Sequence, residues 1–197
     1  MKLYDMELSG NCYKVRLFCA LIDTPIEIVE VDFMNDEHKS DKCKQLNPFC
    51  ELPILVDNEI TLRDSQAILV YLASKYGDER WWPKEPYLQA DVMQWLSVAA
   101  SEIRHGPNAA RLIDKFNIPL DRYVARQQSA RILSLLEEHL STNDWLAAKR
   151  LTIADCAVFP YVALSWEGGI EIQKYPHIQA WLKRIKQLPN FISMPGI

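Results

Sequence analysis

Three features that would place this chain in a special class are missing. It has no Cys-x-x-Cys pair, no apolar run long enough to cross a bilayer, and no basic segment followed by an apolar stretch at the N-terminus. A membrane span needs about 20 predominantly apolar residues, and a secretory signal needs that basic and apolar order. We therefore expect neither a membrane protein nor a secreted one.

The cysteines and histidines also lack the spacing of a metal site. There are five cysteines, an odd number, and four scattered histidines. Cysteines without paired spacing or a secretory signal are typical of reduced thiols in a cytosolic protein. We therefore expect a cytoplasmic protein with no metal centre.

A strong excess of charge is missing as well. The chain carries 22 Lys and Arg against 26 Asp and Glu, a net charge of −4. This balance argues against nucleic acid as the main partner, because DNA and RNA binding needs a basic surface. With 197 residues, 49% of them hydrophobic, the chain is long enough for one large globular domain or two small ones.

Residues 1–77 alternate short apolar runs with helical stretches. The pattern predicts strands over 2–6, 26–31, 53–57 and 59–62, and helices over 11–22, 41–46 and 65–76. The first strand-helix-strand unit implies two parallel strands, and the Asp57-Asn58 turn adds an antiparallel hairpin. The resulting order, βαβαββα, predicts an α/β domain of the thioredoxin-like fold.

The second half is helical throughout. Residues 78–86 are polar with two prolines and are interpreted as a linker. Residues 87–197 show helical spacing over 88–103, 122–140, 153–166 and 177–188, with an interruption at Gly106-Pro107. Thr152 and Asp155 fit a capping box. We expect an all-α helical-bundle domain.

The first predicted helix begins with an unusual set of polar groups. Ser9, Gly10, Asn11 and Cys12 gather at its N-terminus. The first N–H groups of a helix have no internal partner, and with the helix dipole they favour negative charge. A serine there can donate a hydrogen bond to an anion, and a cysteine has its thiolate favoured. Both observations point to thiolate chemistry, on a bound thiol or on the protein's own.

Four motifs together resemble the cytosolic glutathione transferase family, in its serine-type, theta-like, phi-like or bacterial form. They are Ser9–Arg16, Asn47–Leu55, Leu62–Ile68 and Leu151–Asp155, in family-like order and spacing. The resemblance covers essentially the whole chain. It implies glutathione as co-substrate, a small electrophile, peroxide or disulfide as second substrate, and a homodimer.

The resemblance also implies roles for single residues. Ser9 would donate to the glutathione thiolate, assisted by Asn11, with Cys12 as a further candidate catalytic group. Asp64 would accept from the γ-glutamyl ammonium. Ser65 and the N–H groups of its helix would hold the γ-glutamyl carboxylate.

The remaining glutathione contacts would come from two loops. Leu52, before a cis Pro53, would offer its backbone to the cysteinyl group, and His38 and Lys39 would meet the glycyl carboxylate. Glu51 departs from the family pattern, in which Gly-Gln often precedes the hydrophobic-Pro pair. Its carboxylate would repel the ligand unless it faces a lysine such as Lys39 or Lys42.

The second-substrate pocket of the family falls on a stretch of the helical half. Trp95, Arg104, His105 and Arg111 lie on or after its first long helix. They are candidates for this pocket, although packing and solvated surface explain them equally well.

Three functions remain open from the sequence. The leading one is a glutathione transferase. The second is a glutathione-dependent disulfide reductase or peroxidase that uses Cys12 or the bound glutathione, because Ser9-x-x-Cys12 has the spacing of a dithiol motif whose first cysteine is serine. The third is a non-catalytic binding protein, in which Ser9 and Asp64 are simply helix caps.

Overall fold

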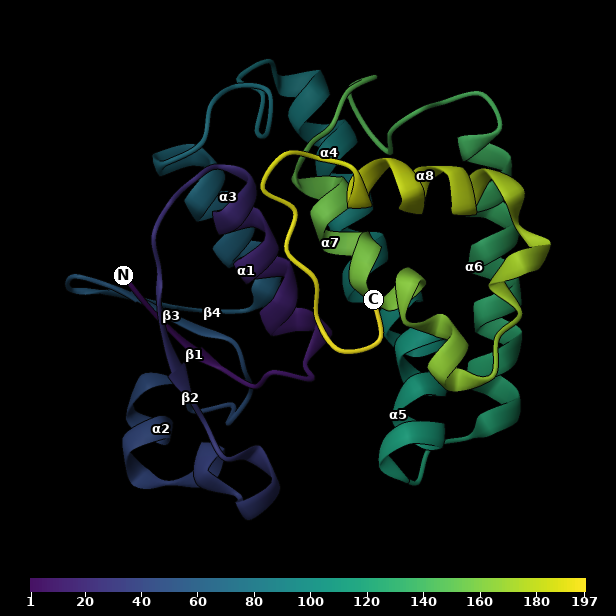
Figure 1. The fold of residues 1–197 in the computed structure, drawn as a ribbon. Coiled ribbons are helices and arrows are strands. Elements are labelled where there is room, and N and C mark those ends of the chain that lie inside the picture. The colour runs from purple at the N-terminus through teal and green to yellow at the C-terminus, as the bar shows by residue number, and fades with distance from the viewer.

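A computed structural model describes all 197 residues of the chain. The sheet and its helices form one side of the molecule and the helical half forms the other (Figure 1). The elements of the first side are β1 (Lys2–Asp5), α1 (Gly10–Leu21), β2 (Glu27–Glu30), α2 (Asp41–Leu46), β3 (Ile54–Asp57), β4 (Ile60–Arg63) and α3 (Ser65–Lys75). The predicted order βαβαββα is confirmed.

The four strands form one mixed sheet in the order β2-β1-β3-β4. In β1, Leu3 lies opposite Ile28 of the parallel strand β2 and opposite Leu55 of the antiparallel strand β3. Leu3 and Leu55 are fully buried, so they join the sheet to the core. The hairpin turns at Asn58, whose φ of 55° is in the left-handed region that asparagine tolerates.

The second side contains only helices. They are α4 (Pro86–Ala100), α5 (Ala109–Phe116), α6 (Arg122–Leu140), α7 (Ile153–Ala163) and α8 (Pro176–Lys186). The interruption expected at Gly106-Pro107 is a π-helical turn over Arg104–Asn108 that joins α4 to α5. Pro107 has no N–H for the usual helical ladder, and a wider turn accommodates this loss.

The capping box at the start of α7 is also confirmed. The Ala154 N–H donates to the Thr152 hydroxyl at 3.2 Å, and the Thr152 N–H donates to the Asp155 carboxylate at 3.0 Å. Asp155 also accepts from the indole N–H of Trp181 at 2.9 Å. This buried carboxylate therefore ties the start of α7 to α8.

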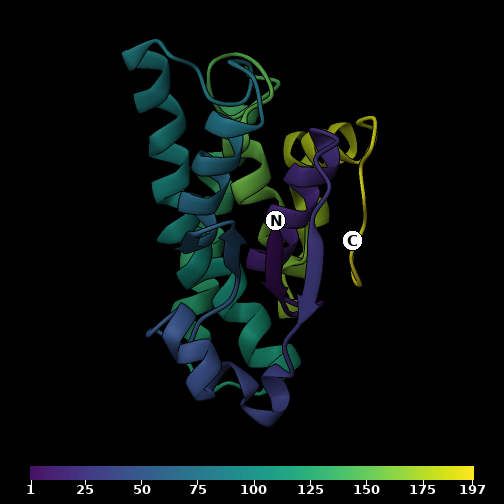
Figure 2. The ribbon, with the colours of Figure 1, turned by 90° about the vertical axis from the view of Figure 1, so that its left-hand side faces the viewer.

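The two sides share one hydrophobic core. In Figure 1, α1 and α3 lie between the sheet and the helical half, where α1 packs against α7. Trp81, in the connecting segment, is 7% exposed and meets Phe18 of α1 edge-on at 5.1 Å between ring centroids. The Tyr13 hydroxyl donates to the Ile192 carbonyl at 2.7 Å, which fixes the C-terminal segment beside α1. Figure 2 shows this segment at the side of the sheet.

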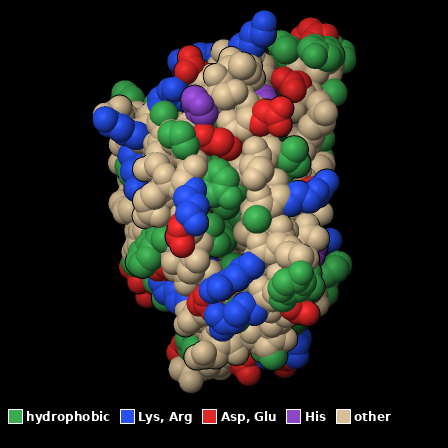
Figure 3. All heavy atoms as spheres, turned by 90° about the vertical axis from the view of Figure 1, so that its right-hand side faces the viewer, with side chains coloured by type: hydrophobic (Ala, Val, Ile, Leu, Met, Phe, Trp, Pro, Cys, Tyr) green, Lys and Arg blue, Asp and Glu red, His purple; other side chains and the backbone are tan.

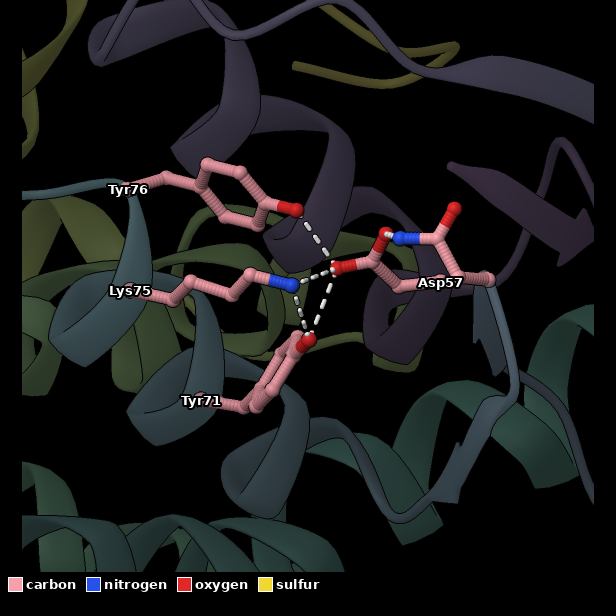
Figure 4. Close-up of polar contacts among 5 residues, drawn as sticks. Asp57, Tyr71, Lys75 and Tyr76 are labelled. Atoms are coloured by element: carbon pink, nitrogen blue, oxygen red, sulfur yellow. Dashed lines mark hydrogen bonds and ion pairs between the residues drawn. The ribbon is translucent and has the colours of Figure 1, made fainter.

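A polar cluster fastens the hairpin to the end of α3 (Figure 4). One oxygen of the buried Asp57 carboxylate, Oδ2, accepts from Lys75 at 2.8 Å, Tyr71 at 2.7 Å and Tyr76 at 2.5 Å. The hydrogen bonds from Lys75 and the two tyrosines hold the pKa of Asp57 well below its usual range. The cluster is fully paired within the protein, which indicates a structural role.

Charges of both signs are interspersed on the outer face of the helical half (Figure 3). No helix is both long enough and apolar enough to span a bilayer.

Candidate functional site

A cavity of about 490 Å³ lies between the two sides of the molecule. Its sheet-side wall is formed by the start of α1, the loops before α2 and β3, and the start of α3. Its helical-side wall is formed by the end of α4, the π-helical turn, α5 and α7. The lining residues are Met6, Leu8, Ser9, Asn11, Phe33, Met34, Cys50, Glu51, Leu52, Pro53, Asp64, Ser65, Gln66, Ala99, Ala100, Arg104, Asn108, Arg111, Leu112, Phe116, Ile118 and Tyr161.

Ser9 lies in the wall of this cavity as the N-cap of α1. Its hydroxyl oxygen accepts from the Cys12 N–H at 3.3 Å. A serine hydroxyl has one hydrogen and two lone pairs, so this bond leaves the hydrogen free to be donated. Ser9 can therefore cap the helix and donate to an anion in the cavity at the same time.

Cys12 is not part of the cavity wall. Its side chain is fully buried. Burial, with a smaller contribution from the Asp5 carboxylate, raises the pKa of the Cys12 thiol to about 12. The structure thus keeps Cys12 protonated near neutral pH and away from ligands, contrary to the expectation that placed it among the catalytic residues.

The start of α3 supplies a second helix N-terminus to the cavity. Asp64 caps it, accepting from the N–H groups of Gln66 at 3.0 Å and Ala67 at 2.9 Å, both on Oδ1. Asp64 has a φ of 69° and a ψ of 120°, a rarely populated backbone conformation of the kind that clusters at functional sites. Its second oxygen, Oδ2, is not used in the cap and can accept from a ligand.

The starts of α1 and α3 are in contact. The Ser65 hydroxyl lies 3.4 Å from the Asn11 side-chain oxygen and also forms a short hydrogen bond with the Gln66 side chain. Behind them, the buried ammonium of Lys14 is 3.5 Å from the Gln66 oxygen. Burial lowers the pKa of Lys14 to about 8. Two motifs more than fifty residues apart in sequence thus form one polar corner of the cavity.

The loop before β3 forms the adjacent wall. The Leu52–Pro53 peptide bond is cis, as the resemblance implied, and both residues line the cavity. The Glu51 carboxylate also lines it and is 3.6 Å from the Arg104 guanidinium. The cation facing Glu51 is therefore this arginine of the helical half, and not Lys39 or Lys42 as expected.

His38 and Lys39 do not reach the cavity. The His38 ring is buried in a stack on Phe33, with 3.9 Å between centroids, and burial lowers its pKa. Lys39 points to Asp36, with 2.8 Å between the charged atoms. Phe33 and Met34 of the same loop line the cavity instead. Stacking and a local ion pair thus draw both predicted residues away.

The helical wall contains only some of the residues expected there. Arg104 and Arg111 line the cavity, whereas Trp95 packs on His139 with 4.8 Å between centroids and His105 is exposed. Sequence reasoning missed Tyr161 of α7. Its buried ring lies so close to Gly10 that a Cβ there would be 2.7 Å from a ring carbon. The glycine is needed for this close approach, but nothing near Gly10 in the sequence says which distant residue approaches it.

Burial raises the pKa of Tyr161 to about 12, so its hydroxyl stays protonated near neutral pH. The cavity therefore combines hydroxyl donors, two helix N-termini and an arginine-bearing wall. Such a site suits a peptide-like ligand with carboxylates and a thiol. No group of three or more His, Cys, Asp or Glu side chains lies close enough together to hold a metal ion.

Comparison with known sequences gives consistent relatives for both sides of the molecule. The family model described as "Glutathione S-transferase, N-terminal domain" matches residues 3–80, and that described as "Glutathione S-transferase, C-terminal domain" matches residues 121–189. Glutathione S-transferase 3 of Zea mays is 33% identical, over 97% of this chain and 91% of the relative. Human glutathione S-transferase theta-1 is 29% identical, over 94% of this chain and 82% of the relative.

Solved structures agree over almost the whole chain. A glutathione S-transferase from Pseudomonas fluorescens superposes with a TM-score of 0.91 at 28% identity, covering 98% of each chain. A glutathione transferase homologue from Drosophila mojavensis, with bound glutathione, superposes with a TM-score of 0.86 at 27% identity, covering 95% of this chain and 88% of the other. The fold, the two family models and the full-length relatives agree, and the chain belongs to the glutathione S-transferase family.

Proposed function

We propose that this glutathione transferase uses the Ser9 hydroxyl to stabilise the thiolate of its co-substrate glutathione for attack on an electrophile. The observation that carries the proposal is the position of Ser9. It caps α1 in the wall of a cavity that also receives the N-terminus of α3. A free thiol has a pKa of about 8.5, so a hydrogen bond and a helix N-terminus are needed to keep it ionised at neutral pH.

The polar corner suits the γ-glutamyl end of glutathione. In this arrangement Asp64 accepts from the ammonium through Oδ2. The first N–H groups of α3 take the carboxylate, together with the Ser65 hydroxyl once its single hydrogen turns from the Gln66 oxygen to the ligand. The Asn11 side chain lies beside Ser65 at 3.4 Å. The Leu52 backbone pairs with the cysteinyl group.

This placement divides the chain into two functional parts. Residues 1–77 bind glutathione, residues 78–86 link the parts, and residues 87–197 hold the second substrate. Holding both reactants in one cavity converts a bimolecular reaction into an effectively unimolecular one, which supplies much of the acceleration. Stabilisation of the thiolate contributes as well. Lowering a thiol pKa by about two units corresponds to ~2.7 kcal/mol of preferential stabilisation of the thiolate over the thiol.

The proposal is tested by comparing two serine caps. Ser9 and Ser40 each accept from the N–H three residues ahead at 3.3 Å, but Ser40 does not line the cavity. Ser9→Ala should lower kcat with 1-chloro-2,4-dinitrobenzene about 100-fold, as loss of a donor to a developing anion does, with little change in glutathione affinity. Ser40→Ala should lose only a cap, worth about 1 kcal/mol of stability. Equal kcat values for Ser9→Ala and Ser40→Ala would contradict the role of Ser9 as a donor to the thiolate.

The reductase or peroxidase based on Cys12 is not favoured. An attacking sulfur must be a thiolate and must reach its target, and the Cys12 thiol is buried with a pKa of about 12. A non-catalytic binding protein is not favoured either, because the family's relatives are transferases over nearly the full length of this chain.

We further propose a homodimer that works in the cytoplasm and removes reactive electrophiles. The unpaired state of all five cysteines supports a reducing compartment. The exposed Phe49 ring, held under the Arg63 guanidinium at 3.7 Å, supports a protein contact at that loop.

A further inference from the structure

Arg111 is one of the largest fully buried side chains of the protein, at 2% exposure, and it lines the cavity. Its Nε is 2.5 Å from Glu167 Oε2, while Lys115 Nζ is 2.5 Å from Oε1 of the same carboxylate. Two cations therefore share one anion, and the group keeps a net charge of +1.

One nitrogen of Arg111, Nη2, is buried and has no hydrogen-bond partner. A buried donor without a partner destabilises the protein, and the cost is larger when the group is charged. Buried unpartnered polar atoms occur also in Asp5, Arg16 and His38, but none of these three residues lines the cavity. Arg111 is thus the one of these four residues that lines the cavity.

The neighbouring residues add further donors on the same wall. Arg104, Asn108 and Arg111 are spaced by four and three residues along the α4–α5 segment, and all three line the cavity. Arg104 is engaged by Glu51, whereas the buried Asn108 side chain forms no hydrogen bond within the protein. Arg111 and Asn108 thus offer donors that the protein itself does not use.

We infer that the second substrate of this transferase carries a carboxylate, bound by the Arg111 guanidinium with the Asn108 amide beside it. The inference rests on the proposed function and names the substrate class of its second subsite. A guanidinium fork matches a carboxylate in geometry and charge. Leu112 and Phe116 border the same wall, so the rest of the substrate is apolar or aromatic.

Binding of unreactive ligands tests the inference without any turnover. Calorimetry with glutathione present would compare 3,5-dinitrobenzoate with its methyl ester, which lacks the charge. The wild-type protein should bind the acid at least about tenfold more tightly than the ester, as expected for a charged hydrogen bond. Equal affinities would overturn the inference.

Arg111→Met should abolish this preference. Lys115 still neutralises Glu167 in that variant, so no carboxylate is left buried and unpaired. Arg111→Lys keeps the charge without the fork and should lose part of the preference, which covers the case in which the methionine variant does not fold. Arg126→Lys, outside the cavity wall, is the matched control. A preference that survives in Arg111→Met, or is equal to wild type in Arg111→Lys, would contradict the inference.

The glycyl carboxylate of glutathione is the other carboxylate that could occupy this position. If Arg111 held the glycyl carboxylate, Arg111→Met would weaken glutathione binding. The wild-type protein would then bind 3,5-dinitrobenzoate and its methyl ester equally well, and the inference would be wrong. Failure of the proposed function shows itself separately, as an unchanged kcat in Ser9→Ala.

Discussion

Ser9 and Cys12 lie on the same turn of α1 but in different surroundings. The Ser9 hydroxyl borders the cavity, whereas the Cys12 side chain is enclosed by the core. The helix N-terminus favours an anion near both residues, yet desolvation of a buried thiolate outweighs that effect and raises the Cys12 pKa to about 12. At the residue scale, this difference in exposure is the reason why the proposed mechanism uses Ser9 and not Cys12.

This contrast predicts the labelling pattern of the cysteines. Cys50 is partly exposed and lines the cavity, while the other four cysteines are buried. With iodoacetamide near neutral pH, Cys50 should react at least about tenfold faster than Cys12. Bound glutathione should slow the reaction of Cys50, because that residue lines the cavity. Peptide mass spectrometry of native and unfolded protein gives the rates. Modification of native Cys12 as fast as Cys50 would contradict the placement of that thiol.

The sequence predicted Ser9, Asp64 and Ser65 at helix N-termini, and all three line the cavity. Helix caps and N-terminal anion sites depend on only a few neighbouring residues, so one sequence is enough to predict them. Two other features depend on distant partners. The Arg111–Glu167 pair spans 56 residues, and the contact between Gly10 and Tyr161 joins the first helix of the chain to α7. The prediction that His38 meets the ligand was wrong because its ring stacks on Phe33, and this contact forms only in the folded loop. One sequence cannot reveal such pairings.

At the scale of elements, two helix N-termini and one helix wall build the site. The wall depends on the π-helical turn, which carries Arg104 and Asn108 toward the cavity between α4 and α5. Periodicity predicted the strands and most helices to within a few residues, since burial on one face repeats along them. It did not predict the π-helical turn, because Gly106-Pro107 more often ends a helix than widens it.

The Asp57 cluster gives a prediction for the hairpin. Asp57→Asn removes the charge that Lys75, Tyr71 and Tyr76 share, so it should lower the free energy of unfolding by about 2 kcal/mol near neutral pH. The pKa of Asp57 is lowered in the folded state. Its stabilising effect is therefore present above the unfolded value of about 3.9 and is lost as the pH falls below it.

Urea unfolding of the wild type and Asp57→Asn at several pH values checks this prediction. The difference in free energy of unfolding between the two proteins should be largest near neutral pH and should become smaller below about pH 4. Glu59→Gln, in the same turn and without an ion pair, should change stability by less than about 0.5 kcal/mol. A difference that grows as the pH falls would contradict the assigned sign.

At the scale of the whole molecule, the exposed Phe49 predicts the assembly. Asn47 fixes the loop, donating to the Glu51 carbonyl at 2.8 Å and accepting from the Phe49 N–H at 3.0 Å, while the ring stays 59% exposed. Sedimentation should find twice the chain mass of 22.8 kDa, and Phe49→Ser should weaken the dimer at least about tenfold.

The control for this test is Leu135→Ser, which changes a residue of α6 that is 49% exposed. It should leave the dimer intact. A monomeric wild-type protein, or a Phe49→Ser protein that dissociates no more than Leu135→Ser, would refute the homodimer built on this loop.

The two sides of the molecule meet in one core and line a common cavity. In the proposed function, this cavity presents the thiol of glutathione at Ser9 to a substrate on the helical wall. The most direct test is the pKa of that bound thiol, followed by the ultraviolet absorbance of the thiolate in wild-type and Ser9→Ala complexes. The thiol pKa in the wild-type complex should be about two units below the free value of ~8.5. In the Ser9→Ala complex it should rise most of the way back to the free value. A bound thiol that titrates like free glutathione, or is unaffected by Ser9→Ala, would contradict the account.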